Sequence, residues 1–550
     1  MSRNGEVTEP LITCPAAPLL KGCIVRSVRA VVAVVAVTIT AVMLASPAAY
    51  GAKDGAWRSW GFDASNTRHN STESTIGVGN VSRLVPKWRL ATAGDVSATP
   101  AVEDGVVYVP DYAGNLYAVD AANGTIKWQA SIAAMTGIAG DFARSTPAIW
   151  GDVLVLGDQA GKLLSPDGYV MGIDKRTGQL LWRTTVEGGY PLMTQSPTIV
   201  NGVAYIGAAS FEEALALFGY PLDFRGFLMA VDVATGSVKW KTYTVPDGYT
   251  GGAVWGSSPA VDAKRGSVYI ATGNNYSVPD AVVTCVSEAT DDAGRAACMD
   301  PANLFDSIVS LNLATGAVKW STRALPTDFW NLNCGVPGFP PFDQPNADCP
   351  PGAGPDHDFA QAPALYKVRG VEFLGAGQKS GTYWALDPAT GAVRWQTQVG
   401  PGGYNGGLQW GSAIDATRIY TAEANSDSKP WELQDGSTVE YGGWSALDPG
   451  TGRILWQRPN PAEGIASGPV SVANGVMYAC SADADGHMYA LKTTDGTVLW
   501  DFASGDRCYA GAAISDGTVY WGTGYTIAGY PDTDPDQALY AFGLPSKPAR

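Results

Sequence analysis

The chain has 550 residues, a formal net charge of -16 and only three histidines. An acidic body of this size repels nucleic acid and anionic lipid, so we expect no nucleic-acid partner. His69, His357 and His487 lie far apart and near no cysteine pair, which argues against a zinc site and against Ser-His-Asp catalysis.

The first 52 residues have the pattern of an export signal. Arg26 and Arg29 lead into an apolar run from Val31 to Ala45, and small residues suited to cleavage follow it. The run is short for a membrane span. We therefore predict a signal peptide or N-terminal anchor over residues 1–52 and a single domain over residues 53–550. The protein should be secreted or periplasmic, and should contact the membrane only if the first segment is retained.

From about Val81 onward the chain is built from repeats. Seven times, an alternating apolar run is followed by a turn and then a tryptophan, with a glycine four residues before the tryptophan. The seven tryptophans are Trp128, Trp182, Trp240, Trp320, Trp395, Trp456 and Trp500. The alternation predicts a half-buried strand, and the glycine predicts a turn with positive φ. The recurrent ring predicts a docking surface for the next unit.

The two ends of the repeated region complement each other. Eight upstream strand pairs are present, but the last downstream half, ALYAFGL at residues 538–544, stops without its tryptophan. The segment RLVPKWRL places Trp88 ahead of the first full unit. A ring that borrows one strand from the opposite terminus leaves no long edge exposed. The sequence thus predicts an all-β, eight-bladed β-propeller closed by pairing of N- and C-terminal strands, with loop insertions.

Six cysteines follow the N-terminal segment, as Cys285/Cys298, Cys334/Cys349 and Cys480/Cys508. An even number in an exported chain favours disulfides, and we assign the first two pairs as such. No Cys-x-x-Cys-His motif is present, so the sequence encodes no covalently attached c-type haem.

Three long insertions interrupt the repeat, at residues 211–225, 275–307 and 327–359. Insertions of this kind wall off a pocket at the channel mouth of a propeller. Glu212, Glu213, Asn274 and Asp358 lie in or beside them, at strand ends. Carboxylate and amide oxygens are the hard ligands that Ca²⁺ prefers. Taken alone, the local pattern of each residue favours an ordinary turn or loop residue over a ligand.

The same segments resemble a known family. GGAVWGSSPAVD, VYIATGNNYS, SFEEA, PDHDFAQAP and GQKSGTYWALD are similar to the quinoprotein alcohol dehydrogenases, eight-bladed propellers that carry pyrroloquinoline quinone (PQQ) and Ca²⁺. Within that family the chain is most similar to the polyvinyl-alcohol-dehydrogenase-like branch. The resemblance covers about Trp57 to Leu544. Paired adjacent cysteines, which many members place against the cofactor, are absent from this sequence.

The resemblance implies a role for each matched residue. Trp255 corresponds to the ring on which the quinone stacks, and Arg144 to a cofactor-carboxylate partner. Glu212, Asn274 and Asp358 correspond to metal ligands, and Glu212 also belongs to the cofactor-binding set. Asp358 corresponds as well to the catalytic base beside the metal, and Lys379 to the cation at the quinone oxygen. Glu213 is an alternative to Glu212, and Asp328 and Asp356 compete with Asp358 for the role of base. Residue 360 is alanine, which resembles calcium-type members.

The implied function is the oxidation of alcohols, including secondary alcohols or polyvinyl alcohol, by hydride transfer to the quinone. Because no haem segment is present, electrons would pass to an external acceptor such as a cytochrome c. A non-catalytic extracytoplasmic scaffold or binding propeller is the first alternative, and a glycan-acting or lectin-like propeller is the second. A scaffold offers no reason for four polar residues to gather at channel-facing strand ends, namely Glu212, Asn274, Asp358 and Lys379.

Overall fold

The computed structural model describes residues 55–336, 341–526 and 537–545. The chain divides into residues 1–46 and 47–550, and all the described residues belong to the second unit. The predicted signal or anchor and the boundary after residue 52 lie outside the described residues and stay predictions. Among the described residues, no helix has the length and apolar character needed to cross a bilayer.

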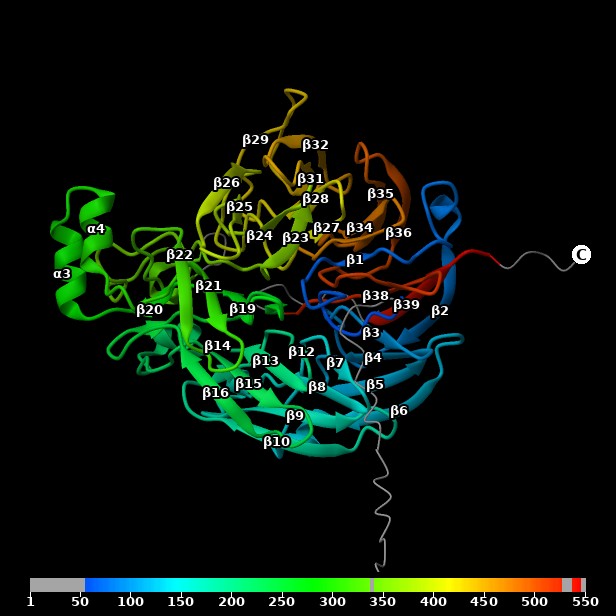
Figure 1. Cartoon of the computed structure of the whole chain (residues 1–550), viewed down its shortest axis with the longest axis horizontal. Helices are drawn as coiled ribbons and strands as arrows, with labels where there is room; N and C mark the ends of the chain where they lie inside the picture. Colours follow the sequence, from blue (N-terminus) through cyan, green and yellow to red (C-terminus); the bar gives the residue numbers. More distant parts are fainter. Residues whose placement is uncertain (1–54, 337–340, 527–536, 546–550) are drawn as a thin grey trace, which may run out of the picture. The chain divides into compact units, whose positions relative to one another are not determined.

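In the described part of the chain, eight blades of four antiparallel strands each are arranged around a common centre, which confirms the predicted eight-bladed propeller (Figure 1). In blade seven, β1 (His69–Asn70) adds a fifth strand that pairs parallel with β33. Blades one and two are β3 (Ala101–Glu103), β4 (Val106–Pro110), β5 (Asn115–Asp120) and β6 (Ile126–Ser131), then β7 (Ala148–Trp150), β8 (Val153–Gly157), β9 (Gly168–Asp174) and β10 (Leu180–Val186). Blades three and four are β12 (Thr198–Val200), β13 (Val203–Gly207), β15 (Phe227–Asp232) and β16 (Val238–Tyr243), then β18 (Ala260–Asp262), β19 (Ser267–Ala271), β21 (Ser307–Asn312) and β22 (Val318–Arg323).

The second half of the ring repeats the pattern. Blades five and six are β23 (Ala364–Val368), β24 (Val371–Gly377), β25 (Thr382–Leu386) and β26 (Val393–Gln398), then β27 (Ala413–Ile414), β28 (Ile419–Glu423), β31 (Gly443–Leu447) and β32 (Ile454–Pro459). Blades seven and eight are β33 (Ser471–Ala473), β34 (Val476–Cys480), β35 (His487–Lys492) and β36 (Val498–Ala503), then β37 (Ala513–Ser515), β38 (Thr518–Gly522), β39 (Ala538–Gly543) and β2 (Val85–Ala91).

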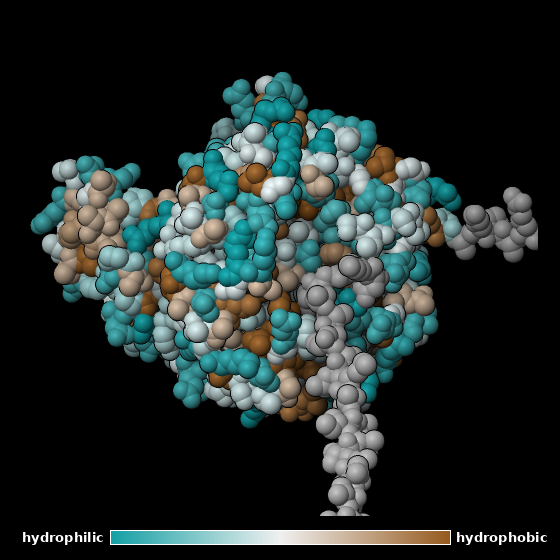
Figure 2. Space-filling view, viewed as in Figure 1, coloured by the Kyte–Doolittle hydropathy of each residue, from teal (hydrophilic) through white to brown (hydrophobic). Residues whose placement is uncertain are grey.

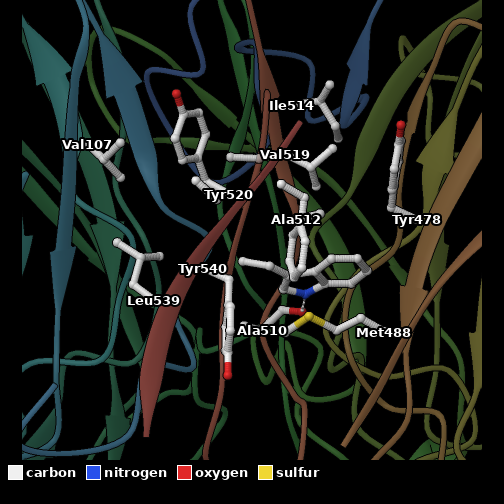
Figure 3. Packing of buried hydrophobic residues seen from close by; sticks show 14 of the residues in the cluster. Val107, Tyr478, Met488, Ala510, Ala512, Ile514, Val519, Tyr520, Leu539 and Tyr540 are labelled. Atoms are coloured by element: carbon white, nitrogen blue, oxygen red, sulfur yellow. Dashed lines mark hydrogen bonds between the residues drawn. The ribbon is translucent and has the colours of Figure 1, made fainter. Parts of the chain in front are cut away.

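The ring is closed by strands from opposite ends of the chain. β2 pairs antiparallel with β39, with Trp88 opposite Ala541. Around this seam, side chains of β38 and β39 pack against residues of β4, β34 and β35 (Figure 3). The Trp521 indole N–H donates a 2.8 Å hydrogen bond to the Ala510 carbonyl oxygen within that core. The predicted N- to C-terminal closure is therefore confirmed.

The repeat glycines and tryptophans meet between neighbouring blades. All seven glycines have φ of 71–76°. A Cβ added to Gly236 would lie 2.7 Å from the ring of Trp182 in the preceding blade, whose indole N–H donates to the Val233 carbonyl oxygen at 2.8 Å. The glycine is needed both for its turn conformation and for the space that the ring occupies.

The insertions carry the short elements outside the blades. They contain α2 (Glu212–Leu215), η3 (Ala216–Phe218), β20 (Asn275–Ser277), α3 (Asp280–Glu288), α4 (Asp292–Cys298) and η4 (Leu332–Cys334), and β14 (Ala209–Ser210) lies just before the first insertion. The remaining elements are β1 (His69–Asn70), η1 (Val81–Arg83), α1 (Ile132–Thr136), η2 (Ala160–Leu163), β11 (Pro191–Leu192), β17 (Thr250–Gly251), β29 (Trp431–Glu432) and β30 (Thr438–Val439).

Three disulfides join cysteines within the described residues. Cys285–Cys298 joins α3 to α4 and Cys334–Cys349 closes the third insertion, which confirms both assigned pairs, and Cys480 bonds Cys508 as well. The α3–α4 pair projects from the edge of the blades in Figure 1, and on the face seen in Figure 2 hydrophobic residues lie scattered among hydrophilic ones.

Candidate active site

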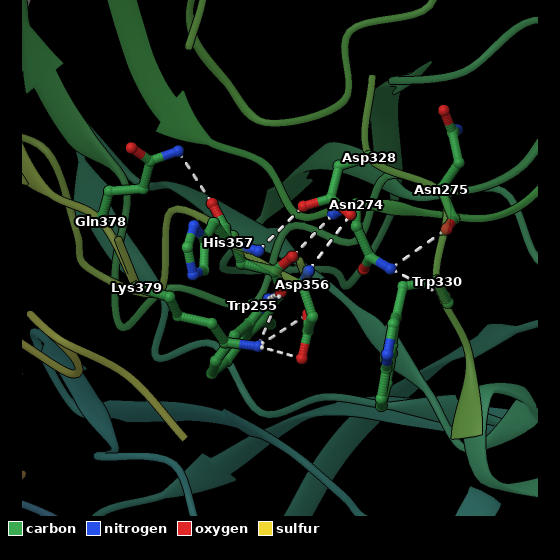
Figure 4. A network of polar contacts seen from close by, with 10 residues as sticks. Trp255, Asn274, Asn275, Asp328, Trp330, Asp356, His357, Gln378 and Lys379 are labelled. Atoms are coloured by element: carbon green, nitrogen blue, oxygen red, sulfur yellow. Dashed lines mark hydrogen bonds and ion pairs between the residues drawn. The ribbon is translucent and has the colours of Figure 1, made fainter. Parts of the chain in front are cut away.

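Asp358 is the point at which the predicted site residues meet. Its Oδ1 accepts a 2.8 Å hydrogen bond from the backbone N–H of Asn274, and its Oδ2 accepts one of 2.8 Å from the indole N–H of Trp255. The Lys379 Nζ lies 3.5 Å from the same Oδ2. In Figure 4 the Asn274 side chain points toward Asn275 and Trp330, so it is the backbone N–H of Asn274 that contacts Asp358. Four predicted residues therefore come together.

Lys379 is held by a second carboxylate. Its buried ammonium lies 3.0 and 3.1 Å from the two carboxylate oxygens of Asp356. Burial alone would lower the pKa of Lys379, but the charges of Asp356, Asp358 and Glu213 outweigh burial and raise it. Lys379 is thus a fixed cation beside Asp358.

Asp328 fixes the backbone that carries Asp356 and Asp358. One of its oxygens accepts from the N–H of Asp356 at 3.2 Å and the other from the N–H of His357 at 2.8 Å. Burial, opposed by these hydrogen bonds, raises the pKa of Asp328 to about 6. Both of its hydrogen bonds thus go to the backbone of its own insertion, which gives Asp328 a role in fixing that backbone.

Glu212 and Glu213 face different surroundings. Glu212 is fully buried, its Oε2 accepts the N–H groups of Asp223 and Phe224 at 2.8 Å each, and its Oε1 has no partner among the described residues. Burial, and next the charge of Asp358, raise the pKa of Glu213 to about 8. The charge of Asp358 therefore acts on Glu213, the alternative ligand, whereas the pKa of Glu212 is raised by burial and by Asp223.

Arg144 lies in a neighbouring part of the channel. Its guanidinium carbon is 4.7 Å from the centroid of the Trp410 ring. The rings of Trp410 and Trp255 pack edge-to-face, with 5.5 Å between their centroids. Arg144 is therefore linked to the Asp358 group through two indoles and does not contact Asp358 itself.

Aromatic side chains border the ammonium of Lys379. Its Nζ is 5.2 Å from the centroid of the Trp255 ring and 5.8 Å from the centroid of the Tyr404 ring. Tyr404 in turn packs on the buried Trp330, with 5.1 Å between the two ring centroids. The Trp330 carbonyl oxygen also accepts from the Asn274 side-chain N–H at 2.8 Å. These rings limit water near the charged group.

The side chains of this site are of the chemical types that bind Ca²⁺ and PQQ. The buried carboxyl group of Asp306 lies against that of Asp328, and burial, followed by the charges of Asp328 and Asp358, raises the pKa of Asp306. Oε1 of Glu212 has no hydrogen-bond partner among the described residues. The donors are hard oxygens, as Ca²⁺ requires, and Arg144 and Lys379 are cations suited to an anionic quinone. Within the described ranges, however, no three His, Cys, Asp or Glu residues already form a metal-binding group.

Sequence reasoning missed two features of this site. Asp356 was considered only as a competing base, whereas it is the main partner of Lys379. Asp306 was not singled out, because it precedes a blade strand in a position typical of a turn residue, and its φ of 41° carries no signal in the sequence.

Comparisons with known proteins show which families the chain is similar to. The family model described as outer membrane protein assembly factor BamB matches residues 85–290 and 379–534. A polyvinylalcohol dehydrogenase from Pseudomonas sp is 30% identical over 86% of this chain and 72% of its own length. A second one, from Sphingopyxis sp. (strain 113P3), is 30% identical over 86% of this chain and 71% of its own.

Solved structures share the fold at lower identity. The quinohemoprotein alcohol dehydrogenase from Comamonas testosteroni superposes with a TM-score of 0.65 at 19% identity, over 90% of this chain and 82% of that one. A europium-containing methanol dehydrogenase gives a TM-score of 0.64 at 17% identity, over 89% of this chain and 98% of that one.

Proposed function

Because the chain belongs to the quinoprotein alcohol dehydrogenase family, in its polyvinyl-alcohol-dehydrogenase-like branch, we propose that it oxidises alcohols with PQQ and Ca²⁺. The observation that carries the proposal is the convergence of Trp255, Asn274 and Lys379 on the carboxylate of Asp358. A scaffold would need no such buried cluster of opposite charges, whose desolvation is costly.

When bound, PQQ and Ca²⁺ would supply a hydride-accepting quinone and a Lewis acid. Asp358 would accept the hydroxyl proton of the alcohol. The N–H groups of Trp255 and Asn274 hold its two oxygens in place before the substrate arrives. Lys379 would stabilise negative charge that develops beside it, since Asp356 holds its ammonium there.

We propose a role for each residue that would hold Ca²⁺ or PQQ. Asn274 uses its side-chain N–H groups on the carbonyl oxygens of Asn275 and Trp330, so its amide oxygen remains for a cation. Glu213 or the unpartnered oxygen of Glu212 would supply a carboxylate. Trp255 would provide the stacking surface, and Arg144 and Lys379 the positive charge.

The disulfides support an extracytoplasmic location, because such bonds persist in oxidising compartments.

A soluble cytochrome c is the kind of acceptor we propose for the electrons. Secondary alcohols and polyvinyl alcohol are the first substrates to test, because the relatives from Pseudomonas and Sphingopyxis are named for the latter.

The test is reconstitution of the purified chain with PQQ and Ca²⁺, followed by mixing with an alcohol panel and a reducible dye. We expect dye reduction, and we expect Asp358→Asn to lower kcat by at least about 100-fold while PQQ absorbance survives desalting. Asp104→Asn, at a side chain that is 81% exposed, is the control and should leave kcat unchanged. Absence of both dye reduction and retained quinone in the wild type would refute the proposal.

A further inference from the structure

Two carboxyl groups of blade two are buried against each other, apart from the site described above. Asp141 lies between α1 and β7, Asp158 follows directly on β8, and both side chains are fully buried. Oδ1 of Asp141 accepts the N–H of Phe142 at 2.8 Å, and Oδ1 of Asp158 accepts the N–H of Tyr169 at 2.9 Å. The two side chains are also hydrogen-bonded to each other. Each carboxyl group therefore has the other as a direct partner.

A hydrogen bond between two carboxyl groups requires a proton, because ionised carboxylates are acceptors only. Burial, and next the charge of Asp141, raise the pKa of Asp158 well above its ordinary value. Burial also raises the pKa of Asp141, although hydrogen bonds from the Thr136 hydroxyl, the Phe142 N–H and the Asp158 carboxyl oppose it. This is the arrangement expected of a pair that holds one proton, with Asp158 as donor and Asp141 as acceptor.

The corresponding turns of two other blades satisfy their aspartate differently. In blade one, Oδ2 of Asp111 accepts the hydroxyl of Tyr117 at 2.9 Å and the side-chain N–H of Asn115 at 3.0 Å. In blade seven, Oδ2 of Asp483 lies 2.8 Å from the ring Nδ1 of His487. Of these three described turns, only that of blade two has a second carboxyl group against the aspartate. The pair is thus a local feature of this blade and not a property of the repeat.

The pair connects the segment at residues 137–144 with the loop after β8. The backbone N–H of Gln159 donates to the Phe142 carbonyl oxygen at 2.9 Å, which is a second link between the same two stretches. Arg144 stands only three residues after Asp141. The hydrogen bond between the carboxyl groups therefore helps to set the position of Arg144.

The surroundings of the pair supply no counter-charge. The elements packed around it carry these ionisable residues: Asp111 and Tyr112 before β5, Lys162 in η2, Asp167 and Tyr169 at β9, Arg183 on β10, and Arg144 in the segment itself. Within the described ranges, none of their side chains forms a hydrogen bond or an ion pair with either carboxyl group. A second ionisation would therefore place two buried like charges together.

We propose that Asp141 and Asp158 are positioning residues that share one proton and thereby hold the segment carrying Arg144 against blade two. When rising pH removes the shared proton, two buried carboxylates repel each other, the hydrogen bond is lost and the segment is released. The consequence for PQQ rests on the proposed function, because it requires Arg144 to contact the cofactor. The consequence for stability does not.

Thermal unfolding of the purified chain without added cofactor tests the shared proton. Asp158→Asn keeps the size of the side chain and gives Asp141 a permanent N–H donor. Because the folded wild type keeps a proton that the unfolded chain releases above the ordinary Asp pKa of 3.8, its stability falls as pH rises toward the folded pKa. We expect the melting temperature of the wild type to fall relative to Asp158→Asn by about 2 °C or more between about pH 5 and about pH 9. Lys162 titrates in both proteins, so the comparison cancels its effect.

Further variants and a spectrum keep this test decisive. Asp141→Asn reverses the direction of the hydrogen bond and should also lack the pH dependence, whereas Asp104→Asn, at a side chain that is 81% exposed, is the control and should retain it. The infrared difference spectrum of wild type minus Asp158→Asn should contain the carbonyl stretch of a protonated carboxyl group at neutral pH. Parallel melting profiles of the wild type and both pair variants, or absence of that band, would overturn the proposal. Stabilisation of the wild type but not of Asp158→Asn by added Ca²⁺ would overturn it too, because a cation would then hold the pair.

PQQ titrations with Ca²⁺ present, at the same two pH values, test the positioning of Arg144. The dissociation constant of the wild type should rise with pH about fivefold more than that of Asp158→Asn. Equal changes in both proteins would overturn the role of the pair in positioning Arg144. Failure of both proteins to bind PQQ at either pH would refute the proposed function instead, and the melting profiles would still decide whether the pair shares a proton.

Discussion

The carboxylates around Lys379 differ in their partners, and this difference separates their roles. Asp328 uses both oxygens on backbone N–H groups, and Asp356 uses both on the Lys379 ammonium. Asp358 is held by Trp255 and Asn274 at the meeting point of the insertions. We therefore keep Asp358 as the base and assign Asp356 to the positioning of Lys379.

Asp356→Asn tests this division of roles. Without the carboxylate, the Lys379 ammonium loses its nearest counter-charge, and we expect kcat to fall about tenfold because the cation is less well positioned. Steady-state kinetics of the reconstituted variant beside Asp358→Asn measures the difference. If Asp356→Asn with PQQ bound is as inactive as Asp358→Asn, Asp356 would be the better candidate for the base.

Lys162 provides a pH-dependent prediction away from the carboxylates. Its folded-state pKa of about 7 lies below the ordinary 10.5, chiefly because of burial. The unfolded chain therefore binds more protons between those values, so this group makes stability rise with pH across that window. We expect the wild type to gain stability relative to Lys162→Met between pH 7 and pH 9.5, by at most about 1.4 kcal/mol per pH unit. A melting-temperature difference that does not change with pH would contradict this.

The site residues that the sequence could predict are those at strand ends within recognisable motifs. Trp255, Asn274, Asp358 and Lys379 met because the blades fix where each strand ends. The choice between Glu212 and Glu213 could not be made, since neighbouring residues on a short helix point to different surroundings. The Lys379–Asp356 pair depends on how a long insertion folds back, which no local pattern encodes.

At the scale of elements, one glycine–tryptophan contact is repeated from blade to blade. Each glycine combines a positive φ with a ring from the preceding blade against its Cα. The constant spacing in the sequence predicted both the turn and the docking ring, because the same contact recurs in every unit. The sequence could not show that the two residues of different units touch each other.

Gly236→Ala tests whether contact with the Trp182 ring adds to the cost of a positive φ at this position. The new Cβ would meet the Trp182 ring at 2.7 Å in addition to the strain at φ 74°, so we expect destabilisation of about 2–4 kcal/mol. Gly105→Ala is the matched control, since its φ is 72° and no atom lies within 4 Å, and it should cost about 1 kcal/mol. Denaturant unfolding midpoints compare the two, and equal losses would show that the ring contact is unimportant.

At the scale of the whole described domain, an N-terminal segment ties the blades together on the inside. Backbone bonds from residues 57–70 reach the innermost strands of several blades, among them Val102, Val261, Leu365, Ile414 and Val472. Arg68 is fully buried and donates to the carbonyl oxygens of Trp60 and Val470. The missing tryptophan predicted closure by β2, but residues 57–70 lack the repeat pattern, so their role was not predictable.

The central claim is that this ring positions Asp358 to remove a proton from an alcohol beside bound PQQ. The most direct measurement is the absorbance of the PQQ- and Ca²⁺-reconstituted chain, mixed anaerobically with a secondary alcohol and no acceptor. The account predicts loss of the oxidised-quinone absorbance in the wild type within one turnover and its persistence in Asp358→Asn. Equal loss in both proteins, or in neither although PQQ is bound, would contradict it.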